Sequence, residues 1–235
     1  MKQSLTPSQK LIEVKNLTVK FYGKIVAVDD VSFDIYKNQN IGLIGSNGAG
    51  KTTVIETIIG INKPTSGQIV YNIKKEEVGV QFQDSLFPQH ISVKQLIDFI
   101  LRSYNIKVSE EELEEMMKVF KVDTFKQKQA SSLSGGQAQR LNVMLCFIHK
   151  PKFVFLDELS TGLDITTRDS FKRFIKQYCE KNDITICLIS HDCNELMYLV
   201  DKLYVMHKGK IIDSILTKDF QTTAELEEYI AKKIL

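Results

Sequence analysis

The chain has 235 residues, of which 43% are hydrophobic, and it carries 31 Lys and Arg against 29 Asp and Glu. This length suits one domain with a sizeable core, and the near-neutral charge gives no general reason to expect a nucleic-acid partner. No apolar segment approaches the roughly 20 residues that a membrane-spanning helix needs, so we expect a soluble chain that reaches a membrane only through a partner.

The amino-terminal part of the chain alternates short apolar runs with polar or glycine turns, which is typical of β-strands. A buried strand over residues 40–45 leads into a glycine-rich loop, and an apolar helix is expected over residues 52–61. The other strands expected here are residues 11–14, 18–21, 31–35, 68–71 and 78–82.

From about residue 85 to residue 150 the apolar pattern becomes helical. The pair Ser109 and Glu112 has the spacing of a capping box and predicts the start of an acidic helix. Strands then alternate with helices, which predicts a mostly parallel α/β sheet. The expected strands are 153–156, 184–190, 203–206 and 211–215, and the expected helices are 166–180 and two that begin near 192 and 222.

The four cysteines show no C-x-x-C spacing and lie mostly in apolar surroundings. This favours buried thiols over metal ligands or disulfides, and it fits a reducing cytosol. These residues are Cys146, Cys179, Cys187 and Cys193.

Residues 45–52 (Gly-Ser-Asn-Gly-Ala-Gly-Lys-Thr) match the phosphate-loop pattern G-x-x-x-x-G-K-[ST] between a strand and a helix. Backbone N–H groups of such a loop wrap phosphates, and the positive end of the helix adds to the attraction. Lys51 can reach the β- and γ-phosphates, and the Thr52 hydroxyl can ligate Mg²⁺. A purely structural glycine turn is the alternative. The expected nucleotide contacts are Gly45, Ser46, Asn47, Gly48, Ala49, Gly50, Lys51, Thr52 and Thr53.

The expected strand at 153–156 ends in two carboxylates, Asp157 and Glu158. Parallel α/β sheets bind ligands at the carboxyl ends of their strands. We therefore expect Asp157 to hold Mg²⁺ and Glu158 to act as the catalytic base that takes a proton from the attacking water. Solvated acids at a strand end are the alternative.

A third motif, residues 133–137 (Leu-Ser-Gly-Gly-Gln), opens an apolar helix that runs to about His149. Ser134 and the glycine amides then lie at a helix N-terminus, which is a second anion-binding position. A glycine-flexed helix cap without a ligand is the alternative.

Together the three motifs resemble the Walker A motif, the Walker B motif and the LSGGQ signature of ATP-binding-cassette (ABC) transporter nucleotide-binding subunits. The resemblance covers nearly the whole chain. It implies an α/β fold, namely a P-loop NTPase (RecA-like) core with an N-terminal antiparallel β subdomain and an inserted α-helical subdomain. Residues 1–235 would form a single domain, with the catalytic core at about 10–84 and 151–235 and the helical subdomain at about 85–150.

The resemblance also assigns roles outside these motifs. Tyr22 resembles the aromatic residue that stacks on adenine, with a place in the strand core as the alternative. Gln83 resembles the glutamine that ligates Mg²⁺ and links catalysis to the helical insertion, with Gln81 as its rival. His191 resembles the switch histidine that faces the γ-phosphate during catalysis. Asp164 belongs to a segment that resembles the loop communicating across the dimer, and we include it among the nucleotide-binding residues.

Two positions depart from the family pattern. Leu159 stands where the family usually has proline, which implies a less rigid loop, and Gln95 stands where related sequences often carry glutamate. Neither change removes a catalytic group.

Family membership would imply a head-to-tail dimer, of identical or different chains, that holds two ATP molecules. The signature of one chain would complete the site of the other through Ser134, Gly135, Gly136 and Gln137. The expected cofactors are ATP and Mg²⁺, with no other metal and no nucleic acid. Transmembrane permease subunits would dock on the helical insertion and hold the chain at the cytoplasmic face of the membrane.

Three segments, at 47–50, 79–83 and 86–88, resemble exporter ATPases more than importer ATPases, so we predict export. The main alternative is a soluble ABC ATPase of a non-transport system, such as cofactor assembly. A P-loop kinase is a weaker alternative, because the signature and His191 have no role in one.

Overall fold

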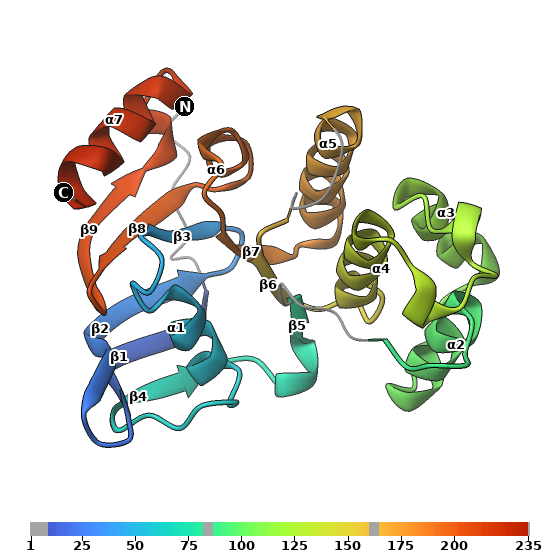
Figure 1. Cartoon of the computed structure of the whole chain (residues 1–235), viewed down its shortest axis with the longest axis horizontal. Helices are drawn as coiled ribbons and strands as arrows, with labels where there is room; N and C mark the ends of the chain where they lie inside the picture. Colours follow the sequence, from blue (N-terminus) through green and yellow to red (C-terminus); the bar gives the residue numbers. More distant parts are fainter. Residues whose placement is uncertain (1–8, 82–86, 160–164, 235) are drawn as a thin grey trace.

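The computed structural model describes residues 9–81, 87–159 and 165–234. Within these residues the chain forms two β-sheets and seven α-helices (Figure 1). The smaller sheet, α1 and the larger sheet lie on one side of the molecule, and α2, α3 and α4 stand together on the other (Figure 1).

The smaller sheet is antiparallel, with the strand order β2–β1–β4. The prediction of separate strands at 11–14 and 18–21 is wrong, because one strand contains both. The polar step between them is an irregularity of the strand at Asn16, where φ is 50°. There the Asn16 N–H donates to Ser32 Oγ and Nδ2 donates to Asp30 Oδ1, both at 2.8 Å, so the strand continues. The strands are β1 (Lys10–Phe21), β2 (Ile25–Tyr36) and β4 (Ser66–Tyr71).

The larger sheet has the strand order β5–β6–β7–β3–β8–β9. Its first five strands are parallel, and β9 runs antiparallel to β8, so the predicted mostly parallel α/β sheet is confirmed. Every residue of the central strands β3 and β7 is buried, as parallel strands covered on both faces require. The strands are β3 (Ile41–Gly45), β5 (Val78–Gln81), β6 (Phe153–Asp157), β7 (Thr185–Ile189), β8 (Lys202–His207) and β9 (Lys210–Leu216).

Side chains cap most of the helix starts. Ser92, Ser109, Ser134 and Asp192 accept backbone N–H bonds at the starts of α2, α3, α4 and α6. The predicted helix starts at Ser109 and Asp192 are therefore confirmed. The helices are α1 (Lys51–Ile58), α2 (Val93–Ser103), α3 (Glu110–Val119), α4 (Gly135–Phe147), α5 (Ile165–Asn182), α6 (Cys193–Leu199) and α7 (Thr223–Ile234).

Two apolar cores cover the two faces of the larger sheet. One lies between this sheet, α1 and the antiparallel sheet. The other lies under α4, α5, α6 and α7, and it continues without a break into α2 and α3. At that continuation the ring of Phe120, just after α3, meets Phe171 and Phe174 of α5 edge-to-face, with centroids 5.2 and 4.8 Å apart. The helices of residues 93–147 are thus packed onto the sheet by shared apolar contacts.

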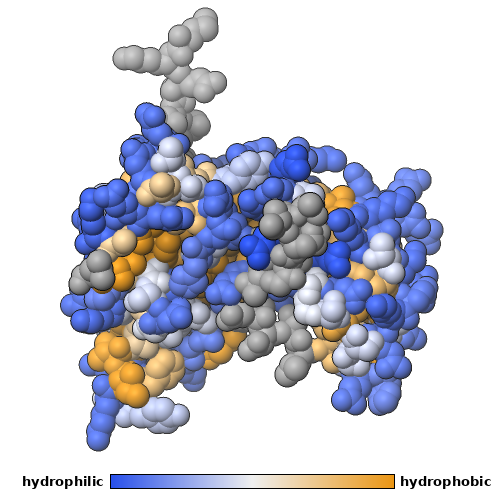
Figure 2. All heavy atoms as spheres, turned by 45° about the horizontal axis from the view of Figure 1, so that its top comes forward, coloured by the Kyte–Doolittle hydropathy of each residue, from blue (hydrophilic) through white to orange (hydrophobic). Residues whose placement is uncertain are grey.

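The four cysteines are buried and form no disulfide, as their sequence context predicts. Figure 2 shows a mostly hydrophilic face with smaller apolar areas between the charged side chains. Within the described residues, no helix combines the length and the apolar character needed to cross a lipid bilayer.

Candidate functional site

A pocket of about 400 Å³ lies where β3, β6 and β7 end. The structure thereby brings the phosphate loop together with the two carboxylates and the histidine, which follow it in the sequence by more than a hundred residues. Ala27 and Ile189, which the sequence did not single out, complete its wall. The predicted residues that line it are Asn47, Gly48, Ala49, Gly50, Lys51, Thr52, Thr53, Asp157, Glu158 and His191.

Two glycines of the loop are required by close backbone approaches. A Cβ atom on Gly45 would lie 2.1 Å from the Met206 carbonyl oxygen, and one on Gly50 would lie 2.3 Å from that of Ala27. Gly50 also has a φ of 98°, which side-chain-bearing residues rarely adopt. The backbones of β8 and β2 therefore leave no room for a side chain at these two positions. Glycine is needed there for packing as well as for the predicted phosphate binding.

Helix α1 begins at this loop with its first amides uncapped by any side chain among the described residues. Its first turn also contains no acidic residue. In α2, α3, α4 and α6 a serine or aspartate oxygen occupies the equivalent position. The N-terminus of α1 therefore keeps its backbone donors and its positive dipole end for an anion in the pocket.

Lys51 is buried, with 7% of its surface exposed, and it points back over the loop. Its Nζ donates to the carbonyl oxygens of Gly45 at 2.7 Å and Ser46 at 3.1 Å. Burial lowers the pKa of Lys51, while Asp157 and Glu158 oppose that shift. The loop carbonyls thus hold an ammonium group at the wall of the pocket that also contains the two carboxylates.

Asp157 ends β6 beside the start of α1. Burial, reinforced by the neighbouring charge of Glu158, raises the pKa of Asp157 to about 6. Lys51 and a hydrogen bond with the Thr52 side chain act in the opposite direction. The Asp157 carboxylate and the Thr52 hydroxyl form a pair of oxygen ligands of the kind that Mg²⁺ prefers, and an incoming divalent cation would offset the repulsion from Glu158.

Glu158 follows with a φ of 55°, a left-handed conformation that is uncommon for a glutamate. Its N–H donates to the Ile189 carbonyl oxygen at 2.9 Å, which ties the turn after β6 to the end of β7. The Glu158 Oε1 lies 4.0 Å from His191 Nε2. The left-handed turn thus directs the carboxylate toward the histidine across the pocket.

The loop that carries His191 is held by a buried acid. The Ser190 hydroxyl donates to Glu195 Oε2 at 2.7 Å and accepts from the Asp192 N–H at 3.0 Å. Ser190 and Glu195 are 3% and 2% exposed. Asp192 in turn caps α6. His191 therefore projects from a backbone fixed on both sides.

Two glutamines hold the carboxylate turn: Gln81, which the sequence offered only as an alternative Mg²⁺ ligand, and Gln139, which sequence reasoning missed. The amide of Gln81, at the end of β5, donates to the Asp157 carbonyl oxygen at 2.9 Å and accepts from the Asp157 N–H at 3.0 Å. The amide of Gln139, in α4, donates to the carbonyl oxygens of Glu158 and Leu159. A polar residue on the apolar face of α4, four residues before Val143, was the available signal for Gln139.

The chain is matched over residues 28–161, more than half of its length, by the family model described as ABC transporter. The chain belongs to the ABC transporter family. It is 30% identical over 214 residues to the sulfate/thiosulfate import ATP-binding protein CysA of Pectobacterium atrosepticum, covering 85% of this chain and 64% of that protein. It is 30% identical over 217 residues to the Fe(3+) ions import ATP-binding protein FbpC of Pasteurella multocida, covering 88% and 62%.

The chain thus spans a little under two thirds of the length of these curated relatives. Among solved structures, an ATP-binding subunit of an ABC transporter superposes with a TM-score of 0.82 at 20% identity, covering 94% of this chain and 98% of that one. That likeness confirms the predicted P-loop NTPase fold. The chain therefore carries an ABC ATPase domain.

The segment predicted to be the ABC signature lies outside this pocket, since none of the four residues Ser134, Gly135, Gly136 and Gln137 is among the described residues that line it. Ser134 begins α4 as predicted: its Oγ accepts from the Gln137 N–H, and Gln137 Oε1 accepts from the Ser134 N–H at 3.2 Å. A Cβ atom on Gly135 would meet no atom within 4 Å among the described residues. The fold of this part of the chain therefore does not itself require glycine there.

Three further residues that the resemblance assigned have different outcomes. Tyr22 is 94% exposed at the turn between β1 and β2, so the alternative that places it in the strand core is wrong. Its predicted stacking on adenine stays a prediction. Gln83 and Asp164 lie outside the described residues. The rival Gln81 is 1% exposed and bonds the Asp157 backbone.

Leu159, which replaces the usual proline, is fully buried. Its side chain packs in the core shared with α4 and α5. Apolar contact therefore anchors the loop at the position where the departure from the family pattern implied less rigidity.

Within residues 9–81, 87–159 and 165–234, no group of three or more His, Cys, Asp or Glu side chains could hold a metal ion by itself. A Mg²⁺ ion at Asp157 and Thr52 would therefore need further ligands from phosphate and water, which is its usual mode of binding at nucleotides.

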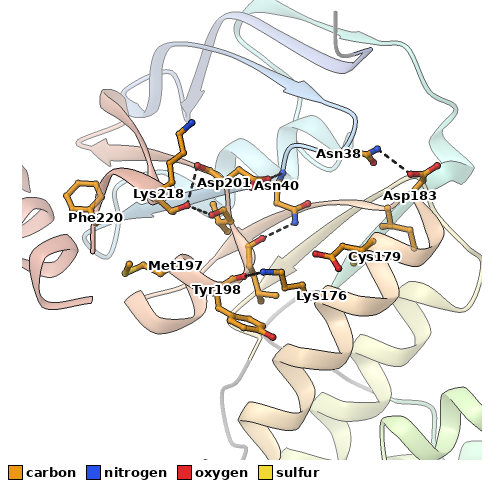
Figure 3. Close-up of a pocket in the computed structure, with 15 residues that line it drawn as sticks. Asn38, Asn40, Lys176, Cys179, Asp183, Met197, Tyr198, Asp201, Lys218 and Phe220 are labelled. Carbon is orange, nitrogen blue, oxygen red and sulfur yellow. Dashed lines mark hydrogen bonds between the residues drawn. The ribbon is translucent and has the colours of Figure 1, made fainter. Parts of the chain in front are cut away.

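A second cavity, of about 580 Å³, lies where β3, β7 and β8 begin, at the edge of the sheet opposite the nucleotide pocket (Figure 3). Two of its polar side chains bond to backbone carbonyl oxygens of the protein itself. Asn40 Nδ2 donates to the Leu199 carbonyl oxygen at 2.9 Å, and Lys176 Nζ donates to that of Tyr198 at 3.3 Å. These bonds join α5, α6 and the start of β3. The polar groups that make them therefore stabilise the packing of these elements.

Proposed function

We propose that the chain is the ATP-binding and ATP-hydrolysing subunit of an ABC transporter, and that it works as a dimer beside separate transmembrane subunits. The pocket that joins Lys51, Asp157, Glu158 and His191 is the observation that carries this proposal. Its phosphate loop, uncapped α1 and opposing carboxylates suit a triphosphate with a divalent cation.

Each group in the pocket has a distinct role. Lys51 and the amides at the start of α1 bind the phosphates. Thr52 and Asp157 would hold Mg²⁺, which would neutralise phosphate charge. Glu158 takes a proton from the attacking water. His191, whose Nε2 lies 4.0 Å from Glu158 Oε1, faces the γ-phosphate. Gln83 would add a Mg²⁺ ligand, and Tyr22 would stack on the adenine.

The signature completes the site of a second copy or of a related subunit. Two observations support this: Ser134 to Gln137 lie outside the chain's own pocket, and Gly135 has open space in front of it. The amides of Gly135 and Gly136, which precede the Gln137 N–H that Ser134 bonds, would then bind the γ-phosphate held by the partner. Asp164 is proposed to act in the contact between the two chains. ATP would join the two chains, and hydrolysis would release them.

The division into a catalytic core at about 10–84 and 151–235 and a helical subdomain at about 85–150 belongs to this proposal. The clustering of α2, α3 and α4 supports it (Figure 1). In this arrangement the permease subunits contact the helical part, and the chain lies peripherally at the cytoplasmic face of the membrane.

The proposal leaves two directions of transport to distinguish, export and import. Export was predicted from segments near residues 47–50, 79–83 and 86–88, whereas the two relatives named above are import proteins. The nucleotide chemistry in the pocket is the same for import and for export. The transmembrane subunits therefore determine the direction of transport. Substrate flux measured in inside-out and right-side-out membrane vesicles separates export from import.

The second candidate is an ABC ATPase of a cofactor-assembly system, which would use the same pocket without a permease. Purification of the chain from detergent-solubilised membranes, with identification of its companions, separates the two. A companion with about six apolar segments of 20 residues supports transport, and a companion without such segments supports the alternative.

Glu158→Gln tests the proposed chemistry. The amide cannot accept the proton, so turnover should fall by about 10²–10⁴-fold, while ATP still binds and drives dimer formation. Phosphate release and ATP binding are measured on the same preparation. Glu114→Gln, an exposed change on α3, is the matched control and should leave turnover unchanged. Near-normal turnover in Glu158→Gln would contradict the assignment of the base.

A further inference from the structure

The turn that carries the two carboxylates is held by side chains from outside it. Gln81 bonds the peptide N–H and the carbonyl oxygen of Asp157. Gln139 Nε2 donates to the next two carbonyl oxygens, of Glu158 at 2.9 Å and Leu159 at 3.3 Å. The backbone is thus fixed through three consecutive residues, and the last two depend on one side chain of α4.

Gln139 is buried, with 7% of its surface exposed. It is not among the described residues that line the nucleotide pocket, so contact with nucleotide does not explain it. A buried amide is costly unless its polar atoms are bonded, and here the amide N–H groups reach the carboxylate turn. The position of Gln139 on the apolar face of α4 therefore allows its amide to bond the carbonyl oxygens of residues 158 and 159.

The backbone of Glu158 needs such support. Its left-handed φ of 55° is disfavoured for a glutamate and persists only where the surroundings enforce it. The Glu158 N–H is fixed by the Ile189 carbonyl oxygen, and the Glu158 carbonyl oxygen is fixed by Gln139. Without the second bond the Glu158 backbone would be able to leave the left-handed conformation, and the direction of its side chain toward His191 would change with it.

We infer that Gln139 is a positioning residue for Glu158, and that through it the signature helix controls the catalytic carboxylate of its own chain. Gln139 lies five residues after Ser134, within the second turn of α4. A shift of α4 when Ser134 binds the nucleotide of the partner would move Gln139, and hence the Glu158 peptide. This inference rests on the proposed role of Glu158 as the base.

Gln139→Met tests the inference, because methionine keeps the length and apolar contacts of the side chain but donates no hydrogen bond. We expect the Kd for ATP to change little and the Tm to fall modestly, because two carbonyl oxygens lose their donor. We expect kcat to fall by about 10- to 100-fold, the range that a small misplacement of a reacting group produces. Gln177→Met, at an exposed position of α5, is the matched control and should keep full turnover.

Gln139→Glu separates positioning from packing. Its carboxylate has the same shape as the amide but would face two carbonyl oxygens, so kcat should fall further than in Gln139→Met. A role in packing alone predicts wild-type kcat for Gln139→Met, and that result would overturn the inference. If either variant unfolds, Gln139→Asn replaces it, because the shorter side chain loses the two contacts. The hydrogen exchange of the Glu158 and Leu159 amides is then measured, and we expect it to become faster. Unchanged protection there also overturns it.

A double-mutant cycle connects the effect to Glu158. In the Glu158→Gln background, Gln139→Met should cause no further loss of turnover, because the group that it positions is gone. Losses that multiply would show a role independent of Glu158 and would overturn the inference. The two proposals fail differently: if Glu158 is not the base, Glu158→Gln itself remains active, whereas if only the inference fails, Glu158→Gln is inactive and Gln139→Met turns over normally.

Discussion

Burial beside Glu158 raises the pKa of Asp157 from 3.8 to about 6, so the folded protein resists the charge on which Mg²⁺ binding depends. Between these pH values the folded chain keeps a proton that the unfolded chain has lost. The contribution of Asp157 to stability is therefore present below pH 3.8 and is lost as the pH rises through about 6. This is the reverse of the behaviour of a salt-bridged aspartate.

Asp157→Asn should therefore stabilise the protein without nucleotide. We expect the free energy of unfolding in urea to rise by about 1–2 kcal/mol at about pH 7.5, a figure discounted for partial exposure, and the gain to disappear at about pH 4. Asp219→Asn, at an exposed position, is the control and should show neither effect. An equal gain at both pH values would contradict the burial of charge as its cause.

At the residue scale, sequence reasoning found the groups that a local pattern identifies. Lys51, Thr52, Asp157 and Glu158 lie within short motifs, and the structure places them all in one pocket. Gln139 escaped prediction because its partners, Glu158 and Leu159, are 19 and 20 residues away along the chain. Its role follows from how α4 packs against the end of β6, which no local pattern encodes.

At the scale of elements, periodicity predicted the parallel sheet and the helical stretch. In β1 the polar residues between the two apolar runs led to the wrong prediction of two strands. Asn16 was interpreted as part of a turn, but bonds to Ser32 and Asp30 compensate for the irregular backbone. Such compensation depends on the neighbouring strand β2, so the sequence of β1 alone could not show it. The positions of helix ends were predictable where a serine or aspartate cap marks them.

The attachment of α3 to α5 through Phe120 gives the prediction at this scale. Phe120 is fully buried between Phe171 and Phe174, so Phe120→Ala should lower the free energy of unfolding by about 3–5 kcal/mol. Phe99→Ala removes the same ring from a position on α2 that is 65% exposed and should cost far less. Urea unfolding followed by circular dichroism measures both. Similar losses would mean that Phe120 does not anchor α3 to α5.

At the scale of the whole molecule, the chain has two helix starts that we propose bind anions, and the two do not share a pocket. The start of α1 belongs to the pocket with Asp157 and Glu158, and the start of α4 carries the ABC signature outside it. Gln139 links the second to the first within one chain. If the signature serves a partner, each chain senses the nucleotide of the partner through α4 and adjusts its own Glu158.

A mixing experiment tests this account most directly. Ser134→Arg blocks the signature, and Lys51→Ala disables the phosphate loop, so each variant alone should hydrolyse little ATP. Mixed dimers contain one intact composite site, and an equal mixture should recover up to about a quarter of wild-type turnover, since half of the dimers are mixed and each has one working site. A mixture no more active than the two variants measured separately would contradict the central claim that the catalytic pocket of one chain is completed by the signature of another.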